Sequence, residues 1–168
     1  MQKISTFLWY DHQAEEAANH YVSVFSSRPG AASAEGDSRI TNVSRTGEAG
    51  PGGPGSVMIV NFLLEGQEFI ALNGGPAHGF TEAISLFVHC DSQEEVDHFW
   101  NRLLADGGRE DACGWLKDRY GLSWQIIPNA LLDLMGDPDP AKSQAVTGAM
   151  LQMKKIEIDG LRRAYEAA

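Results

Sequence analysis

The hydrophobic pattern changes its period early in the chain. Residues 4–10 form a β-branched and aromatic run, which is typical of a strand and stops at Asp11-His12. Beyond this point the apolar residues recur at the spacing of a helix: Ala14, Ala17, Ala18, Tyr21, Val22 and Phe25. The pattern therefore predicts a strand followed by an amphipathic helix, which ends in the turn-forming segment 26–30.

A β-hairpin is predicted next. Residues 46–56 are rich in glycine and proline, so we expect a loop there and expect it to be the most mobile segment. The runs 56–64 and 68–72 have strand character, and Glu65-Gly66-Gln67 between them favours a tight antiparallel turn.

The second half of the chain predicts the same elements. Residues 84–90 form a strand-like run, and Ser92 with Glu95 three residues later is a helix-capping pattern. The apolar face of that helix consists of Val96, Phe99, Trp100, Leu103 and Leu104. Strand-like pieces then follow near 112–117 and 123–128. Two further helices are expected, one starting at Asp139-Pro140 and one near Asp159.

The two halves are related by pattern. A shift of 79 positions aligns Thr6 with Ser85, Glu15 with Glu94, Ala17 with Val96, Tyr21 with Trp100, and Val24 with Leu103. We interpret this as a duplicated βαβββ module, although two unrelated strand–helix units could coincide in this way. The predicted architecture is a single α+β domain with module one at 1–75, module two at 82–130 and C-terminal helices at 131–168. Two such modules can curl their mixed sheets into a half-barrel with an open cleft.

Motifs spread over nearly the whole chain carry a family resemblance. They are ISTFLWY at 4–10, EEA at 15–17, ISL at 84–86, CD at 90–91, CGWLKD at 113–118, GLSWQ at 121–125 and AMLQMKK at 149–155. With these motifs the chain resembles the PhnB-like family, often labelled 3-demethylubiquinone-9 3-methyltransferase. This family lies within the vicinal oxygen chelate superfamily of glyoxalases, bleomycin-resistance proteins and extradiol dioxygenases. The resemblance implies a glyoxalase-like fold of paired βαβββ modules, but no particular reaction.

Composition and charge exclude several partners. The 168 residues carry a formal charge of −10 and no basic stripe, so we do not expect nucleic acid to bind. The sequence contains no apolar run of about 18 residues, the length of a membrane span, and no secretory leader pattern. We therefore expect a cytoplasmic protein without a membrane partner, with its two cysteines, Cys90 and Cys113, reduced.

Methyl transfer is not favoured by the sequence. S-adenosylmethionine is usually held by a glycine-rich turn between a strand and a helix. Here the glycine-rich segment 50–55 is interrupted by prolines and precedes a predicted strand. We therefore predict no cofactor, and the sequence assigns no catalytic residue.

A metal site is also not predicted. The resemblance implies that metal ligands, where present, come from the first and last strand of each module. The 79-residue shift places the first-strand positions at Thr6 and Ser85, and alignment of Gly66 with Gly121 places the last-strand positions at Ile70 and Gln125. These residues offer no imidazole, carboxylate or thiolate. An alternative set of His89 with His12 or His78 has no second ligand at short spacing.

The lining of the predicted cleft follows from strand alternation. Ser123, Gln125 and Ile127 share one face, and the larger apolar set Trp124 and Ile126 is expected to meet the helix. By the same rule Thr6 is placed inside with Ile4 and Leu8, Ser85 is placed with Phe87 and His89, and Trp115 shares a face with Lys117. The predicted ligand-binding residues are Thr6, Ser85, His89, Trp115, Lys117, Ser123 and Gln125. Alternatively, these polar groups could satisfy one another in a closed barrel.

Three functions remain open at this point. The first is a metal-independent binding protein for a small, partly apolar organic molecule, which could be anionic. The second is a metal-dependent lyase, isomerase or oxygenase of glyoxalase or dioxygenase type, and the third is a structural dimer without a ligand. We expect a homodimer, because free strand edges and the C-terminal apolar stripes, such as Val146, Met150 and Met153, need cover. A tail folded back on its own sheet would instead leave a monomer.

Overall fold

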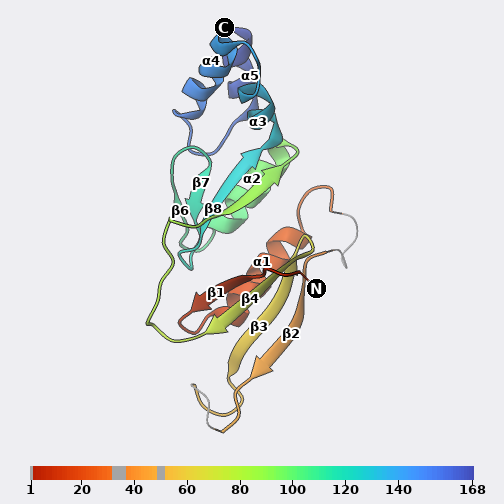
Figure 1. Cartoon of the computed structure of the whole chain (residues 1–168), viewed down its shortest axis with the longest axis vertical. Coiled ribbons are helices and arrows are strands. Elements are labelled where there is room, and N and C mark those ends of the chain that lie inside the picture. Colours follow the sequence, from red (N-terminus) through yellow and green to blue (C-terminus); the bar gives the residue numbers. More distant parts are fainter. Residues whose placement is uncertain (1, 32–36, 49–51) are drawn as a thin grey trace. The chain divides into compact units, whose positions relative to one another are not determined.

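The computed structural model describes residues 2–31, 37–48 and 52–168 (Figure 1). The chain forms two compact units, Met1–Phe80 and Thr81–Ala168, and each is described by itself. Residues 49–51 of the loop expected to be mobile lie outside the described residues. At its two ends this loop is closed by backbone hydrogen bonds between Thr46 and residues 55 and 56.

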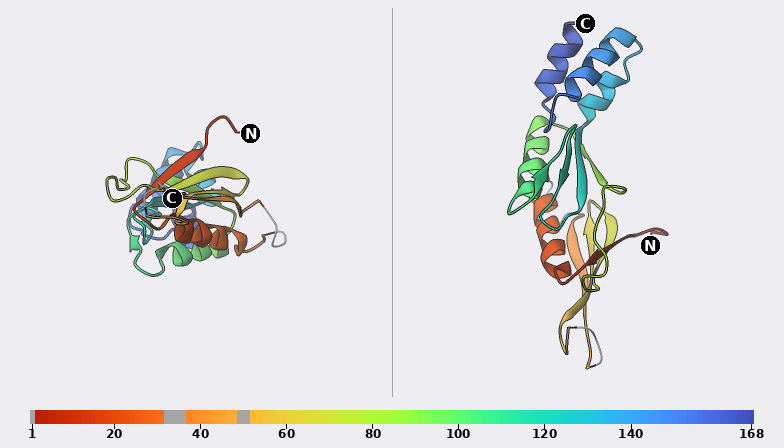
Figure 2. Two further views of the ribbon diagram at one scale, coloured as in Figure 1. Left: turned by 90° about the horizontal axis from the view of Figure 1, so that it is seen from below. Right: turned by 90° about the vertical axis from the view of Figure 1, so that its left-hand side faces the viewer.

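The first unit has the element order β-α-β-β-β. Its elements are β1 (Thr6–Tyr10), α1 (Ala14–Ser26), β2 (Arg39–Arg45), β3 (Val57–Leu64) and β4 (Gln67–Asn73). The strands form one mixed sheet in the order β1-β4-β3-β2, in which β1 runs parallel to β4 and the other pairs are antiparallel. Helix α1 covers one face of this sheet (Figures 1 and 2), and its apolar side packs against β3.

The predicted hairpin between β3 and β4 is confirmed. Its two turn residues, Glu65 and Gly66, both have positive φ, 48° and 77°, as the common two-residue hairpin turn requires. Glycine adopts this conformation freely, whereas Glu65 is held in place by neighbouring groups. Its backbone N–H donates to the Ser38 hydroxyl, and its carboxylate accepts from the Arg28 guanidinium at 2.7 Å.

The second unit repeats the order and adds three helices. Its elements are β5 (Leu86–Cys90), α2 (Gln93–Leu104), β6 (Arg109–Glu110), β7 (Trp115–Lys117), β8 (Ser123–Pro128), α3 (Asn129–Met135), α4 (Pro140–Met150) and α5 (Ile158–Glu166). The sheet order is β5-β8-β7-β6, with β5 parallel to β8. The fold is therefore α+β with duplicated βαβββ modules, as predicted. The described strands form two four-stranded mixed sheets and no closed barrel.

The predicted helix starts are found where the capping residues stand. The Ser92 hydroxyl accepts the backbone N–H of Glu95 at the start of α2, and the Asp139 carboxylate accepts that of Ala141 at the start of α4. None of the described helices is long and apolar enough to cross a membrane.

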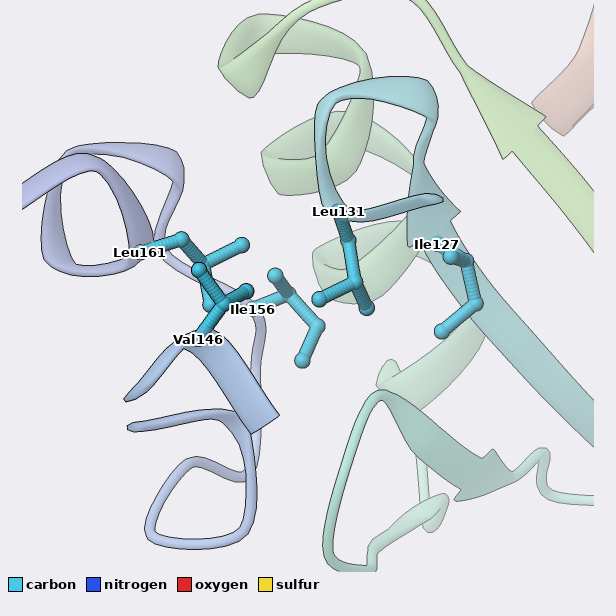
Figure 3. Close-up of a cluster of buried hydrophobic side chains, with 5 residues drawn as sticks. All are labelled: Ile127, Leu131, Val146, Ile156 and Leu161. Carbon is cyan, nitrogen blue, oxygen red and sulfur yellow. The ribbon is translucent and has the colours of Figure 1, made fainter. Parts of the chain in front are cut away.

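The C-terminal helices pack against their own module. Ile127 on β8 and Leu131 on α3 form a buried cluster with Val146, Ile156 and Leu161 of the tail, and the five side chains point toward one another in Figure 3. Met150 and Met153 pack against the same cluster. The apolar stripes of the C-terminal helices are therefore covered within the chain. The part of the argument for a dimer that rested on these stripes is wrong.

The tail is also held by hydrogen bonds to the βαβββ core of its unit. The Gln93 side chain donates to the carbonyl of Ile156 at 3.1 Å and accepts the N–H of Ile158 at 2.8 Å. The backbone N–H groups of Cys113 and Gly114 donate to the carbonyls of Met153 and Lys154 at 2.8 and 2.7 Å. The tail therefore satisfies polar groups in the module as well as covering apolar ones.

We expect the Cys90 thiol to be unreactive in the folded protein. It is fully buried beneath α2, and burial, followed by the nearby carboxylates of Glu95 and Asp91, raises its pKa to about 12. In a C113S variant, Ellman's reagent at pH 8 should label no thiol until guanidinium is added. Rapid labelling of the native variant would contradict this.

Candidate functional site

One face of the second sheet collects most of the predicted site residues. We call it the polar face, and it consists of Phe87 and His89 on β5, Trp115 and Lys117 on β7, and Ser123, Gln125 and Ile127 on β8. The strand register pairs Phe87 and Trp115 with Gln125, His89 with Ile127, and Lys117 with Ser123, so these side chains emerge on the same side.

The opposite face of this sheet packs under α2. It carries Val88, Cys90, Leu116, Trp124 and Ile126, and each of these is buried. The apolar side of α2, with Val96, Phe99, Trp100 and Leu103, is buried as well. The prediction that the larger apolar set of β8 meets the helix is thereby confirmed, and the polar set lies on the other side.

A hydrogen bond brings Ser85 to the polar face. The Gln125 amide donates to the Ser85 hydroxyl at 2.8 Å. Beside them, the rings of Phe87 and His89 lie 4.7 Å apart, and His89 Nδ1 is 3.2 Å from the Asn129 amide oxygen. Six of the seven predicted ligand residues are therefore gathered in this region of the second unit.

Lys117 on the polar face is paired with a carboxylate that the sequence analysis did not identify. Its ammonium contacts Glu82, which lies just before β5 in a segment without regular structure. The hydrogen bond from Lys117 holds the pKa of the Glu82 carboxyl below its ordinary value, with Arg109 as a weaker cationic contributor. The Lys117 side chain is 23% exposed, so the pair is only partly shielded from water.

Ser123 lies directly across from Lys117 and is 1% exposed. Its hydroxyl has no hydrogen-bond partner within the described part of the chain. Buried hydroxyl groups in folded proteins nearly always have a partner, so this one marks an unusual position.

A buried carboxylate fixes the loop between β7 and β8. Asp118 accepts the backbone N–H groups of Tyr120 and Leu122 at 2.9 and 3.1 Å, and the indole N–H of Trp124 at 2.8 Å. Lys117 and Ser123 are the residues on either side of this loop. The Asp118 hydrogen bonds therefore fix the relative positions of the two residues.

Thr6 does not occupy the position that strand alternation suggested. It shares a face of β1 with Leu8 and Tyr10, which are buried, and the Tyr10 hydroxyl lies 3.3 Å from that of Tyr21 on α1. Thr6 is thus on the helix side of the first sheet, while Phe7 and Trp9 are on the other side. Ile4, expected inside with Thr6, precedes the strand and is exposed. A ligand-binding role for Thr6 stays a prediction, without support from its position.

The reason is a difference of one residue between the modules. Three residues separate β1 from α1, but only two separate β5 from α2. The 79-residue shift therefore aligns the helices, whereas the sheet register aligns β1 with β5 at a shift of 80, so that Phe7 pairs with Ile70 as Phe87 pairs with Gln125. An error of one residue in a strand exchanges its two faces.

The residues at the positions where the sequence analysis considered metal ligands do not fit a metal ion. With the corrected register these positions are Phe7 with Ile70 in one module and Phe87 with Gln125 in the other. Phenylalanine and isoleucine offer no donor atom, so the amide oxygen of Gln125 is the one possible ligand at these four positions, too few to hold a metal ion. Across residues 2–31, 37–48 and 52–168, no group of three or more His, Cys, Asp or Glu side chains is placed to hold a metal.

The described residues also lack the elements expected for S-adenosylmethionine. Its strand-to-helix connections, residues 11–13 and 91–92, contain no glycine. The glycines at 52, 53 and 55 precede strand β3 instead of a helix. The residues present do not fit this cofactor.

Two hollows lie at the start of the module helices. The first, of about 530 Å³, is lined by Asp11, His12, Glu15, Gly52, Ser56, Val57, Asn73 and Gly75. The second, of about 290 Å³, is lined by Asp91, Ser92, Gln93, Ala130, Glu157, Ile158, Asp159 and Arg162. The side-chain amides of Asn73 and Gln93, one in the lining of each hollow, are bonded to backbone groups.

Comparison with known proteins places the fold. The family model described as 3-demethylubiquinone-9 3-methyltransferase matches residues 2–127. No match to a curated protein was found. A PhnB protein from Bacillus cereus is 38% identical, with a TM-score of 0.63, over 76% of this chain and 99% of that one. Protein PA1353 from Pseudomonas aeruginosa is 17% identical with a TM-score of 0.58 over 76% of this chain and 98% of that one, which is a likeness of fold. The resemblance stated from the sequence is confirmed: the chain belongs to the 3-demethylubiquinone-9 3-methyltransferase family of PhnB-like proteins.

Proposed function

We propose that this protein binds a small, partly apolar organic molecule on the polar face of the second sheet, without a metal ion. The observation that carries the proposal is the grouping of aromatic rings, one ammonium and neutral hydrogen-bonding groups on one side of β5, β7 and β8. Sites for small organic molecules typically combine apolar walls with a few placed polar groups. The donor set at the metal positions argues against the metal-dependent alternative.

The test uses N-phenyl-1-naphthylamine, an uncharged aromatic probe whose fluorescence rises on transfer from water to an apolar site. We expect F87A, which shortens a side chain that is not in the core, to weaken probe binding about fivefold or more, by loss of aromatic contact. The matched control is L132A, which shortens a similarly exposed apolar side chain on α3. Absence of binding to the wild-type protein, or equal effects of the two variants, would overturn the proposal.

Metal independence is tested on the same protein. Dialysis against EDTA should leave probe affinity and the thermal midpoint unchanged, because a resident ion would have raised that midpoint by mass action. A lower midpoint after dialysis, restored by a divalent metal, would favour the metal-dependent enzyme instead.

We further propose a homodimer located in the cytoplasm. Strands β1 and β5 each lie at one edge of their sheet, and the apolar side chains of Ile4, Phe7 and Ile84 on or beside them are exposed. A second copy is suitable cover for such edges. Light scattering should give about twice 18.3 kDa, and a monomer mass that persists on concentration would contradict this. The free thiols of Cys90 and Cys113 accord with a reducing compartment.

A further inference from the structure

A row of three side chains crosses the polar face from one edge of the sheet. The register pairs Arg109 on β6 with Lys117 on β7, and Lys117 with Ser123 on β8. Directly paired residues project on the same side of a sheet, with Cβ atoms about 5 Å apart. Two cations and one hydroxyl are therefore adjacent in a protein whose formal charge is −10.

This inference rests on the proposed function. We propose that Lys117 and Ser123 bind the anionic group of an aromatic organic acid. When no ligand is bound, the Glu82 carboxylate occupies the position of that anionic group on Lys117. The ligand class is thereby a carboxylate or sulfonate attached to an aromatic body. Phe87 and Trp115 supply the contact surface for that body.

The unpartnered hydroxyl of Ser123 is the first argument. Burial without a hydrogen bond disfavours the folded state, so Ser123 weakens the protein unless something outside the chain completes it. The hydroxyl is covered in the ligand-free protein, so an anionic oxygen can reach it only after Glu82 has left Lys117. That oxygen would then accept a hydrogen bond from the hydroxyl and interact with the ammonium at the same time. Other polar groups of this face, in Gln125 and His89, already have partners within the protein.

The state of Glu82 is the second argument. A carboxylate already lies on the Lys117 ammonium, which is the arrangement that an organic acid would reproduce. Glu82 is 60% exposed and belongs to a segment without helix or strand, so it can leave at low cost. The low pKa of its carboxyl, caused first by Lys117 and also by Arg109, agrees with a local field that favours anions.

The experiment compares two probes that differ in one group. 1-Anilinonaphthalene-8-sulfonate carries a sulfonate on the aromatic skeleton of N-phenyl-1-naphthylamine. We expect K117M to weaken sulfonate binding about tenfold or more, and S123A about threefold or more, because each removes a partner of the anion. The affinity for the uncharged probe should change less than twofold in both variants.

Removal of the Glu82 charge, which competes with the ligand for Lys117, should strengthen binding of the sulfonate probe. E82Q is expected to tighten sulfonate binding about two- to fivefold, the range of a part-exposed ion pair. This gain should vanish in the E82Q/K117M double variant. The control is D106N, which alters the similarly exposed pair of Asp106 with Arg119 and should leave both probes unaffected.

The thermal midpoint of S123A distinguishes a ligand-binding role of Ser123 from a purely structural one. If its hydroxyl serves a ligand, S123A without ligand should raise the thermal midpoint by about 2–4 °C, because an unsatisfied buried group is removed. A lower midpoint, or an unchanged sulfonate affinity in S123A or E82Q, overturns the anion site. If the uncharged probe still binds in that case, the proposed function stands, and if neither probe binds the wild-type protein, both proposals fail.

Discussion

Replacement of Asp118 by alanine is expected to lower the free energy of unfolding by about 3 kcal/mol, measured by urea denaturation. The carboxylate accepts hydrogen bonds from Tyr120 and Leu122 in the β7–β8 loop and from Trp124 on β8, which is among the most deeply buried side chains. Alanine would remove the acceptor that Asp118 offers to the buried indole N–H, together with the hydrogen bonds that hold the loop. An accompanying loss of sulfonate binding is expected, because Lys117 and Ser123 border this loop.

Two variants serve as controls for Asp118. D118N keeps one acceptor oxygen in place and should cost about half as much. D133A removes an exposed carboxylate from α3 and should change stability by less than about 0.5 kcal/mol. Equal stabilities of D118A and D133A would show that the buried hydrogen bonds contribute nothing net.

Replacement of Ile156 by alanine is expected to cost about 3 kcal/mol and to loosen the C-terminal helices. Ile156 has no exposed surface and lies between Val146, Leu161 and Leu131 in the buried cluster (Figure 3). Its truncation removes contacts from α3, α4 and α5 at once, because the cavity is shared by all three. Relative to the wild type, the rate of amide hydrogen exchange in I156A should rise more in residues 140–166 than in β3 and β4.

The control for Ile156 is L151A, because Leu151 lies in the same segment of the chain but is exposed. We expect that variant to stay within about 0.5 kcal/mol of the wild type. Slower or unchanged exchange in I156A would mean that the tail is held by its hydrogen bonds alone.

The elements with strong local signals could be predicted from the sequence. Apolar spacing located α1 and α2, Ser92 and Asp139 marked helix starts, and Glu65-Gly66 marked the hairpin. Strand β2 was not identified individually, because RITNVSR alternates weakly and lies at the sheet edge with two register irregularities. Helix α3 was missed because it follows β8 without an intervening loop.

The candidate site was predicted better in the second module than in the first. In β8 the alternation of Gln125 with Trp124 and Ile126 separates polar from apolar residues, so its faces could be assigned. In β1 both Phe7 and Leu8 are apolar, so alternation alone does not tell which one faces the helix. The pairing of Glu82 with Lys117, and the missing partner of Ser123, depend on tertiary packing and leave no signal in the pattern.

The C-terminal tail has a consequence for how this chain relates to shorter family members. The family match ends at residue 127, yet groups within that stretch depend on later residues: the N–H groups of Cys113 and Gly114, and the side chains of Gln93 and Ile127. A piece cut at the family boundary would expose Ile127 and leave these groups to water. Because the appended helices supply these contacts, we expect a piece that ends at residue 127 to be less stable than the whole chain.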